Sequence, residues 1–292
     1  MASKLWSFTT PIKIPDLSST FASKEVPLRC IPIIIKGAEA IGALMSDQRK
    51  IIFLHLPKTG GTTLVNMLHQ KYGLQQSQII SGDKDSQLRE ALDKSIPFLH
   101  GHFSYQLIEL LREHNYFSAT LLRDPVERVI SRYVHLQHSD EPRLKEERDS
   151  YSNFEDYLQS NYAQNWQCQM LGGRPHSKAD SKIAYQGALQ NLHSFDWVGV
   201  AENLNEGLLD LSLKLGFKNV YYPYLNRRKS EKLWQTIYKE HAEEIADLNK
   251  VDQQLYEAAQ KIYLKNKNIP ASALLKMKFK EIFGPSQPKL KV

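Results

Sequence analysis

An apolar run that ends in a glycine turn constrains the fold of this chain more than any other feature. Residues 51–56 (IIFLHL) are typical of a buried strand, and a helical pattern begins at Thr62. Between the strand and the helix lie Pro57, Lys58, Thr59, Gly60 and Gly61. Glycines let a backbone approach an anion, and the unpaired N–H groups of a helix start point at it. The segment therefore predicts a phosphate cradle between a strand and a helix.

The place of the lysine limits which kind of phosphate cradle this is. In the common loop of nucleoside triphosphate hydrolases the lysine follows the last glycine, whereas Lys58 precedes Gly60 here. An ordinary hydrolase of that class is therefore disfavoured. Residues that can offer backbone N–H groups and hydroxyls to a phosphate are Thr59, Gly60, Gly61, Thr62 and Thr63.

A second junction repeats the strand-to-helix pattern. Residues 117–122 (FSATLL) predict a short buried strand, and Arg123 follows it directly. Asp124 suits a helix N-cap and Pro125 suits a first helical turn. Ser131 then lies about two turns into the helix. Because ligands of open parallel sheets bind at the carboxyl ends of the strands, two such junctions predict sites for two separate phosphates.

The remaining pattern predicts an α/β protein, a P-loop-like three-layer sandwich with a central, mostly parallel sheet flanked by helices. Further strands are expected at 96–99, 196–200 and 220–224. Further helices are expected at 87–94, 104–113, 126–138, 151–171 with a break near Asn161, 180–192, 203–215 and 231–263. We expect three parts: an N-terminal extension at 1–48, one domain at 49–264 and a basic C-terminal tail at 265–292.

The composition narrows the partners without naming them. The formal charge is +6 and the pI is about 9.0, which favours anionic partners in general. The two cysteines, Cys30 and Cys168, give no disulfide framework and suit a reducing compartment. The most apolar N-terminal stretch, 30–45, is short and carries two charges, so no membrane span is expected. No sustained apolar core marks a signal peptide, and we expect a soluble, cytoplasmic protein.

Together these residues carry a resemblance to a known family. PKTGGTT at 57–63 and LRDPVERVISRY at 122–133 resemble the Golgi-type carbohydrate sulfotransferases, which include the heparan sulfate 2-O- and 6-O-sulfotransferases and bacterial relatives. HGHF at 100–103, NWQCQMLGG at 165–173, 196–216 and 243–263 match in the same order. The resemblance covers roughly residues 50–263. Eukaryotic members typically carry an N-terminal membrane anchor, so the expected lack of one suggests a bacterial member.

The resemblance implies a donor and the residues that bind it. The donor is 3′-phosphoadenosine 5′-phosphosulfate (PAPS), whose 5′ end would lie on the loop from Thr59 to Thr63. Arg123 and Ser131 match the positions that bind the 3′-phosphate, and arginine suits phosphate through planar, charge-assisted hydrogen bonds. Lys58 would neutralise the charge that develops as the nucleotide product, adenosine 3′,5′-bisphosphate (PAP), leaves.

The resemblance also implies a general base. An acceptor hydroxyl is a weak nucleophile, and imidazole is poised near neutral pH to remove its proton. His102 matches the family's histidine and is the expected base, with Glu109 or Glu113 as the acidic alternatives. His100 matches a second histidine of the 2-O group and either binds substrate or is structural. We expect no metal, because no carboxylate or cysteine stands at ligand spacing beside these histidines.

The sequence thus predicts a PAPS-dependent sulfotransferase that acts on a hydroxyl, expected to be that of a glycan rather than a nucleic acid. Asn165, Gln167 and Gln169 resemble a family segment near the acceptor pocket, although Trp166 and Cys168 alter its polar pattern. Two alternatives stay open: a P-loop nucleotide phosphotransferase (kinase), and a non-catalytic binder of anionic glycans on the same fold. The acceptor and the oligomeric state are not written in the sequence.

Overall fold

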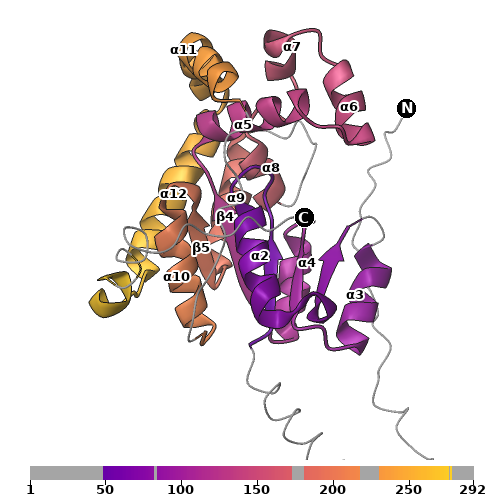
Figure 1. Cartoon of the computed structure of the whole chain (residues 1–292), viewed down its shortest axis with the longest axis vertical. Helices are drawn as coiled ribbons and strands as arrows, with labels where there is room; N and C mark the ends of the chain where they lie inside the picture. Colours follow the sequence, from indigo (N-terminus) through magenta and orange to yellow (C-terminus); the bar gives the residue numbers. More distant parts are fainter. Residues whose placement is uncertain (1–48, 82–83, 173–180, 218–229, 276, 278–292) are drawn as a thin grey trace, which may run out of the picture. The chain divides into compact units, whose positions relative to one another are not determined.

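A five-stranded parallel sheet forms the centre of the structure (Figure 1), which is a computed structural model. It describes residues 49–81, 84–172, 181–217, 230–275 and 277. The strand order is β2-β3-β1-β4-β5, and every neighbouring pair is parallel. The strands are β1 (Ile51–Leu54), β2 (Ser77–Ile80), β3 (Phe98–Gly101), β4 (Phe117–Leu122) and β5 (Trp197–Val200).

Helices connect the strands and continue beyond the last one. Those of the first half are α2 (Gly61–Tyr72), η2 (Leu74–Gln76), α3 (Lys84–Asp93), α4 (Gln106–Glu113), α5 (Pro125–Gln137), α6 (Pro142–Asp149) and α7 (Phe154–Leu158). Those of the second half are α8 (Trp166–Leu171), α9 (Ser181–Ser194), η3 (Ala201–Asn203), α10 (Leu204–Lys214), α11 (Glu231–Leu248) and α12 (Lys250–Asn266).

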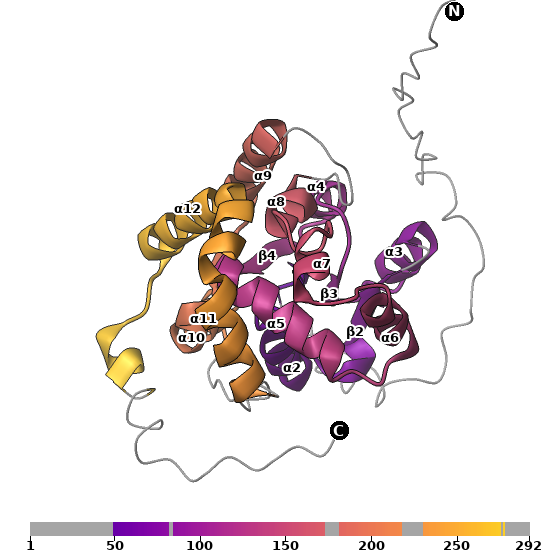
Figure 2. The same cartoon turned by 90° about the horizontal axis from the view of Figure 1, so that it is seen from above.

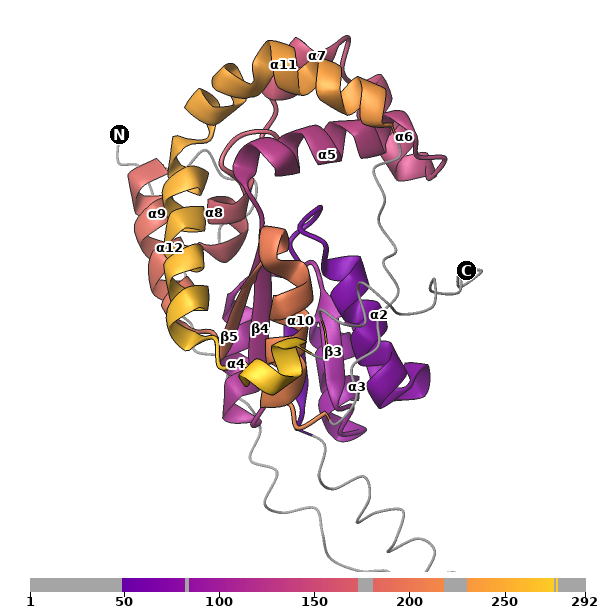
Figure 3. The same ribbon diagram turned by 60° about the vertical axis from the view of Figure 1, so that its left-hand side comes forward.

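Apolar side chains on both faces of the strands hold the layers together. On one face Phe53, Phe98 and Leu121 pack against α2 and α10. On the other face Ile52 and Leu99 belong to a cluster that includes residues of α3, α4, α8, α9 and α12. Figure 3 shows the sheet between α2 on one side and α8, α9 and α12 on the other. Burial on both faces explains why β1, β3, β4 and β5 consist almost entirely of buried residues.

A third apolar cluster lies beyond the carboxyl ends of the strands. It joins α5, α7 and α11 through side chains that include Val129, Ile130, Tyr157 and Ile237. Figure 2 shows α5 and α11 next to one another above the sheet. This helical layer starts directly at the end of β4, so α5 extends outward from the edge where ligands of parallel sheets bind.

The order of the strands places a switch point between β1 and β4. After β1 the chain moves to β2 and β3 on one side, and after β4 it continues to β5 on the other. The loops that follow β1 and β4 therefore leave the sheet next to each other in opposite directions. This crevice is the usual ligand site of open α/β sheets, and Lys58 and Arg123 lie in these two loops.

The predicted fold class is confirmed, with differences in individual elements. Strand β4 begins and ends as predicted, and the predicted helix at 231–263 is two helices that meet at Asn249. Strand β2 and helix α6 were not predicted. Lys267 and Asn268 bond to Glu206 and Asp210 of α10, so packing continues past the expected domain boundary at 264. The extension at 1–48 and the strand expected at 220–224 lie outside the described residues, as does most of the tail.

Candidate active site

The loop after β1 has the backbone of a tight turn. Lys58 has a φ of 69° and Gly60 a φ of 89°, and a positive φ is uncommon for a residue with a side chain. The hydroxyl of Thr59, a fully buried residue, donates to the carbonyl oxygen of Leu56 at 2.8 Å. Thr59 therefore stabilises the turn through its side chain and can offer only its N–H group to a ligand. Thr62 is exposed and Thr63 is buried.

The two helix starts at this edge differ in how they are capped. The start of α2 has no side-chain cap and no acidic residue in its first turn. The start of α5 is capped by Asp124, which accepts a hydrogen bond from the N–H group of Glu127 at 3.0 Å. The α2 start therefore keeps donors and a positive helix end available for an anion, whereas α5 already has an internal carboxylate there. The start of α2 is therefore the better site for an anion.

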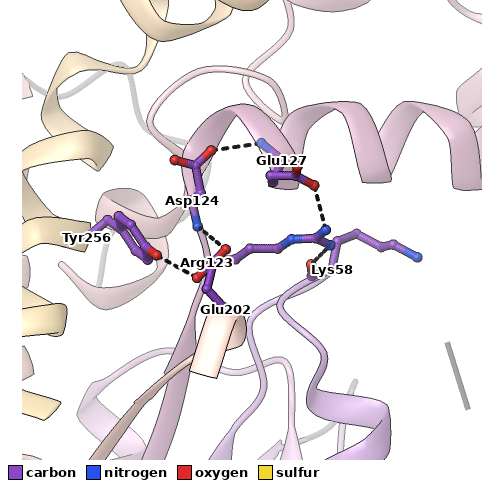
Figure 4. Close-up of polar contacts among 6 residues, drawn as sticks. All are labelled: Lys58, Arg123, Asp124, Glu127, Glu202 and Tyr256. Carbon is purple, nitrogen blue, oxygen red and sulfur yellow. Dashed lines mark hydrogen bonds and ion pairs between the residues drawn. The ribbon is translucent and has the colours of Figure 1, made fainter. Parts of the chain in front are cut away.

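Arg123, at the end of β4, reaches across to the loop after β1 (Figure 4). Its guanidinium donates to the backbone carbonyl of Lys58 at 3.0 Å and to the carboxylate of Glu127 at 2.9 Å. The Lys58 side chain extends away from Arg123 in this view. The two predicted cation sites therefore lie side by side, with the guanidinium held by one backbone oxygen and one carboxylate.

Ser131 lies on the same face of α5 as Glu127. Residues four apart are neighbours on a helix surface, and Ser131 follows Glu127 by four residues within α5. Glu127 is in turn bonded to Arg123. Ser131 thus shares a helix face with the residue that pairs with Arg123.

A second set of contacts near Arg123 was not predicted from the sequence. Glu202 accepts hydrogen bonds from the N–H group of Asp124 at 3.1 Å and from the Tyr256 hydroxyl at 2.6 Å (Figure 4). Gln167 bonds to the backbone of Arg123. These residues are 44 to 132 positions away from Arg123 or Asp124 in the chain, and no local pattern announces such contacts.

His102 follows β3 directly, and its side chain bonds to the backbone of the loop after β1. Its Nδ1 lies 2.5 Å from the carbonyl oxygen of His55. A carbonyl can only accept, so Nδ1 carries the proton and Nε2 of the neutral ring is the basic nitrogen. Although His102 is an exposed residue, desolvation of its ring lowers its pKa below 6.5; the bond with the His55 carbonyl opposes this shift, and the charge of Arg132 adds to it. The ring is therefore neutral near pH 7.

Gly101 explains how the chain reaches this position. A Cβ atom there would lie 2.2 Å from the carbonyl oxygen of Ile80 in β2. Only glycine permits that approach of the two strands. The glycine between His100 and His102 is thus a requirement of the sheet edge.

His100 lies deeper than His102. It belongs to β3, is only 6% exposed and stacks on Phe98 at 4.8 Å between ring centroids. Its Nε2 has no hydrogen-bond partner among the described residues. Burial lowers the pKa of His100 to about 4, with smaller contributions from His69 and His102. The structure thus places His100 among ring side chains, and its expected role in substrate binding stays a prediction.

The acidic alternatives to His102 are exposed residues of α4. Glu113 is the last residue of that helix, and β4 begins four residues later at Phe117. Glu113 therefore lies toward the amino end of β4, opposite the edge that carries Arg123. Glu109 lies one turn nearer the start of α4.

Asn165 and Gln169, expected near an acceptor pocket, bond to neighbouring parts of the helical layer, and their place near a pocket stays a prediction. Asn165 Oδ1 accepts from the N–H groups of Val251 and Asp252 at the start of α12. The Gln169 amide donates to the carbonyl of Gln164 at 2.8 Å. Their polar groups therefore join α8 to its surroundings.

The loops that follow three neighbouring strands thus carry Lys58, Arg123 and the neutral imidazole of His102. Within the described ranges, no group of three or more histidine, cysteine or acidic side chains is placed to hold a metal ion. None of the helices described combines the length and apolar character that crossing a bilayer requires. The arrangement defines a P-loop-like α/β protein whose cations gather at the switch point of the sheet.

A comparison with protein families identifies the class. The sequence model of the sulfotransferase family matches residues 42–266, most of the chain. The chain therefore belongs to the sulfotransferase family and is a PAPS-dependent sulfotransferase. No curated protein sequence is significantly similar to it.

Two solved sulfotransferase structures are similar to this chain at low sequence identity. Mouse sulfotransferase SULT7A1, solved in complex with PAP, is 15% identical with a TM-score of 0.39, over 69% of this chain and 68% of its own. A sulfotransferase from Alicyclobacillus acidocaldarius is 14% identical with a TM-score of 0.36, over 77% of this chain and 99% of its own.

Proposed function

We propose that this protein transfers a sulfuryl group from PAPS to a hydroxyl of a carbohydrate, with His102 as the base and Lys58 at the leaving phosphate. The observation that carries the proposal is the hydrogen bond between Arg123 and the Lys58 carbonyl. It brings the two cationic junctions together at the switch point of the sheet. His102 stands at the end of β3, the other neighbour of β1.

The donor fits the residues present. The uncapped start of α2 supports binding of the 5′-phosphate by the N–H groups of Thr59 to Thr62 and by the exposed Thr62 hydroxyl. The N–H group of Thr63 donates to the Gly60 carbonyl at 3.1 Å, so Thr63 would close the turn beside the phosphate. Arg123 and Ser131 would bind the 3′-phosphate because a guanidinium and a hydroxyl can both donate hydrogen bonds to it. The Glu127 carboxylate, which pairs with Arg123, would oppose this binding. When bound, PAPS supplies the sulfuryl group and a stable leaving group.

The protein's own residues supply charge and a proton acceptor. Nε2 of neutral His102 would take the proton of the acceptor hydroxyl as its oxygen bonds to sulfur. The Lys58 ammonium would stabilise the phosphate oxygen whose bond to sulfur breaks. Such transfers depend on in-line positioning and charge stabilisation, with little covalent work by the protein.

A carbohydrate acceptor rests on the resemblance of the two phosphate motifs to carbohydrate sulfotransferases. His100 would contribute to acceptor binding only if a ligand reaches its buried Nε2. The alternative of a nucleotide phosphotransferase is not supported by the family to which the chain belongs. A non-catalytic glycan binder would bind PAP or glycans without transfer.

The test is transfer of labelled sulfate from PAPS to a panel of glycans, phenols and lipids. We expect label in glycans with the wild-type protein, and a loss of label with Lys58→Ala and with His102→Ala. Label in phenols or lipids alone would overturn the carbohydrate assignment. Binding of PAP without transfer to any acceptor would instead support the glycan binder, and transfer of phosphate from ATP with Mg²⁺ would support a kinase.

A further inference from the structure

Gln167 holds the backbone of Arg123 on both sides. Its Oε1 accepts from the Arg123 N–H group at 3.0 Å, and its Nε2 donates to the Arg123 carbonyl at 2.8 Å. The parallel ladder between β4 and β5 ends one residue earlier, at the pair Leu122 and Val200. The Gln167 amide therefore acts as a strand partner for the one residue that extends beyond the sheet.

The backbone of Gln167 is held in turn by the buried carboxylate of Asp252. Its side chain is fully buried, and its own N–H group donates to Asp252 at 3.0 Å. The neighbouring N–H of Cys168 donates to the other oxygen of Asp252 at 2.8 Å. Asp252 is fully buried near the start of α12. The start of α8 is thus fastened to α12, and the amide of Gln167 has little freedom to move.

From these contacts we propose that Gln167 is a positioning residue for the donor, one that sets the place of Arg123 and so the preference for a 3′-phosphorylated nucleotide. The proposal rests on the proposed function, in which Arg123 binds the 3′-phosphate. Gln167 does not contact the ligand in this proposal. It fixes the Cα of Arg123, from which the guanidinium reaches both Lys58 and Glu127.

The effect should be selective because of where the clamp acts. The 5′ side of the donor lies on α2, whose packing against β1 and β3 does not include Gln167. Loss of the two hydrogen bonds frees the strand end that carries Arg123. The loop after β1 keeps its own bonds, such as that from Thr59 to Leu56. Only ligands with a 3′-phosphate should therefore lose affinity.

The experiment measures Kd by calorimetry for PAP and for adenosine 5′-monophosphate, which lacks the 3′-phosphate. Gln167→Met keeps the side-chain length and removes both hydrogen bonds. Gln169→Met is the matched control, since Gln169 lies on the same helix and its amide bonds to a backbone carbonyl away from Arg123. Arg123→Ala serves as the reference for the 3′-site itself.

We expect Gln167→Met to lower the ratio of the two Kd values, monophosphate over PAP, by about three- to tenfold, the usual size of one or two hydrogen bonds. The Kd of the monophosphate and the ratio in Gln169→Met should stay near wild type. An unchanged ratio in Gln167→Met, or an equal loss for both ligands, would overturn the proposal. If Gln167→Met is unfolded at the assay temperature, the same ratio is measured at a lower temperature at which the variant is folded.

Arg123→Ala separates this proposal from the one before it. A ratio that falls in Arg123→Ala but not in Gln167→Met refutes the positioning role alone. A ratio that Arg123→Ala leaves unchanged refutes the 3′-phosphate site, and with it the proposed role of Gln167.

Discussion

The guanidinium of Arg123 lies 3.0 Å from the backbone carbonyl of Lys58, so the end of β4 is bonded to the loop after β1. That carbonyl belongs to a residue with a φ of 69°. An unusual backbone conformation persists only where its surroundings hold it. Arg123 is one of the groups that hold it, together with the bond from the Thr59 hydroxyl to the Leu56 carbonyl.

Arg123→Ala should weaken PAP binding about ten- to a hundredfold, because the loss of a charge-assisted contact costs about 1.5–3 kcal/mol. Calorimetry with PAP measures this. Arg112→Ala, an exposed arginine in the last turn of α4, is the control and should bind normally. If adenosine 5′-phosphosulfate, without a 3′-phosphate, binds wild type as tightly as PAPS does, the role of Arg123 is refuted.

Glu127→Gln should tighten PAP binding by about three- to tenfold. The carboxylate pairs with Arg123 at 2.9 Å, and a bound 3′-phosphate would lie beside this like charge and compete for the same guanidinium. Glu90→Gln removes the carboxylate of another i,i+4 pair, with Lys94 on α3, and should have no effect. Weaker binding by Glu127→Gln would show that the carboxylate mainly orients Arg123.

His102→Ala should lower turnover by about 10²–10⁴-fold, the usual contribution of a general base, and leave PAP affinity nearly unchanged. Lys58→Ala should reduce both, since the ammonium would contact the donor before reaction. Because the pKa of His102 is lowered, the wild-type rate should fall only at pH values below 6.5. His114→Ala, an exposed histidine just after α4, is the control. Near-normal turnover in His102→Ala would leave Glu109 as the base to test.

The free energy of unfolding should fall as the pH drops from about 6.5 toward 4. Burial lowers the pKa of His55 to about 3 and that of His100 to about 4. Between these values and 6.5 the unfolded chain binds protons that the folded chain does not, so acid favours unfolding. The stability that comes from keeping these two histidines neutral is fully present above pH 6.5 and is lost as the pH falls toward their folded pKa values.

His100→Phe tests this directly, because it keeps a ring beside Phe98 and removes the titration. Denaturant unfolding at several pH values gives the free energy of unfolding as a function of pH. Near pH 5 the slope of this curve should be smaller in His100→Phe than in wild type by about 1.4 kcal/mol per pH unit, the contribution of one proton. A wild-type slope in His100→Phe would mean that His100 is not kept neutral by the fold.

The sequence was sufficient to predict strands that are buried on both faces of the sheet. Strand β4 was predicted in full because all six of its residues are buried, as is typical of a central parallel strand. Strand β2 was missed because it is a short edge strand, SQII, of which only Ile80 is buried. Helix α6 was missed because none of its eight residues is buried, so it has no apolar stripe to recognise.

In the candidate site, features set by local sequence patterns were predicted, whereas contacts between distant residues were not. The positions of Lys58 and Arg123 at two strand-to-helix junctions were predicted because a strand, a turn and a helix start are local patterns, and their roles toward the donor stay predictions. Gln167 was instead associated with an acceptor pocket, because its bond to Arg123 spans 44 residues and arises only from the packing of α8. The bond of the Thr59 hydroxyl within the turn was not predicted either. A threonine in a glycine loop can bond to the loop or to a phosphate, and the sequence does not distinguish the two.

The helical layer beyond the sheet has its own apolar cluster, separate from the two that cover the strands. Substitutions inside it, for example at Val129 or Ile237, change contacts among α5, α7 and α11 and leave the packing of β1 on α2 intact. Protein engineering can use this separation. Libraries of variants confined to the outer surface of the helical layer should leave the packing beneath the loop after β1 unchanged.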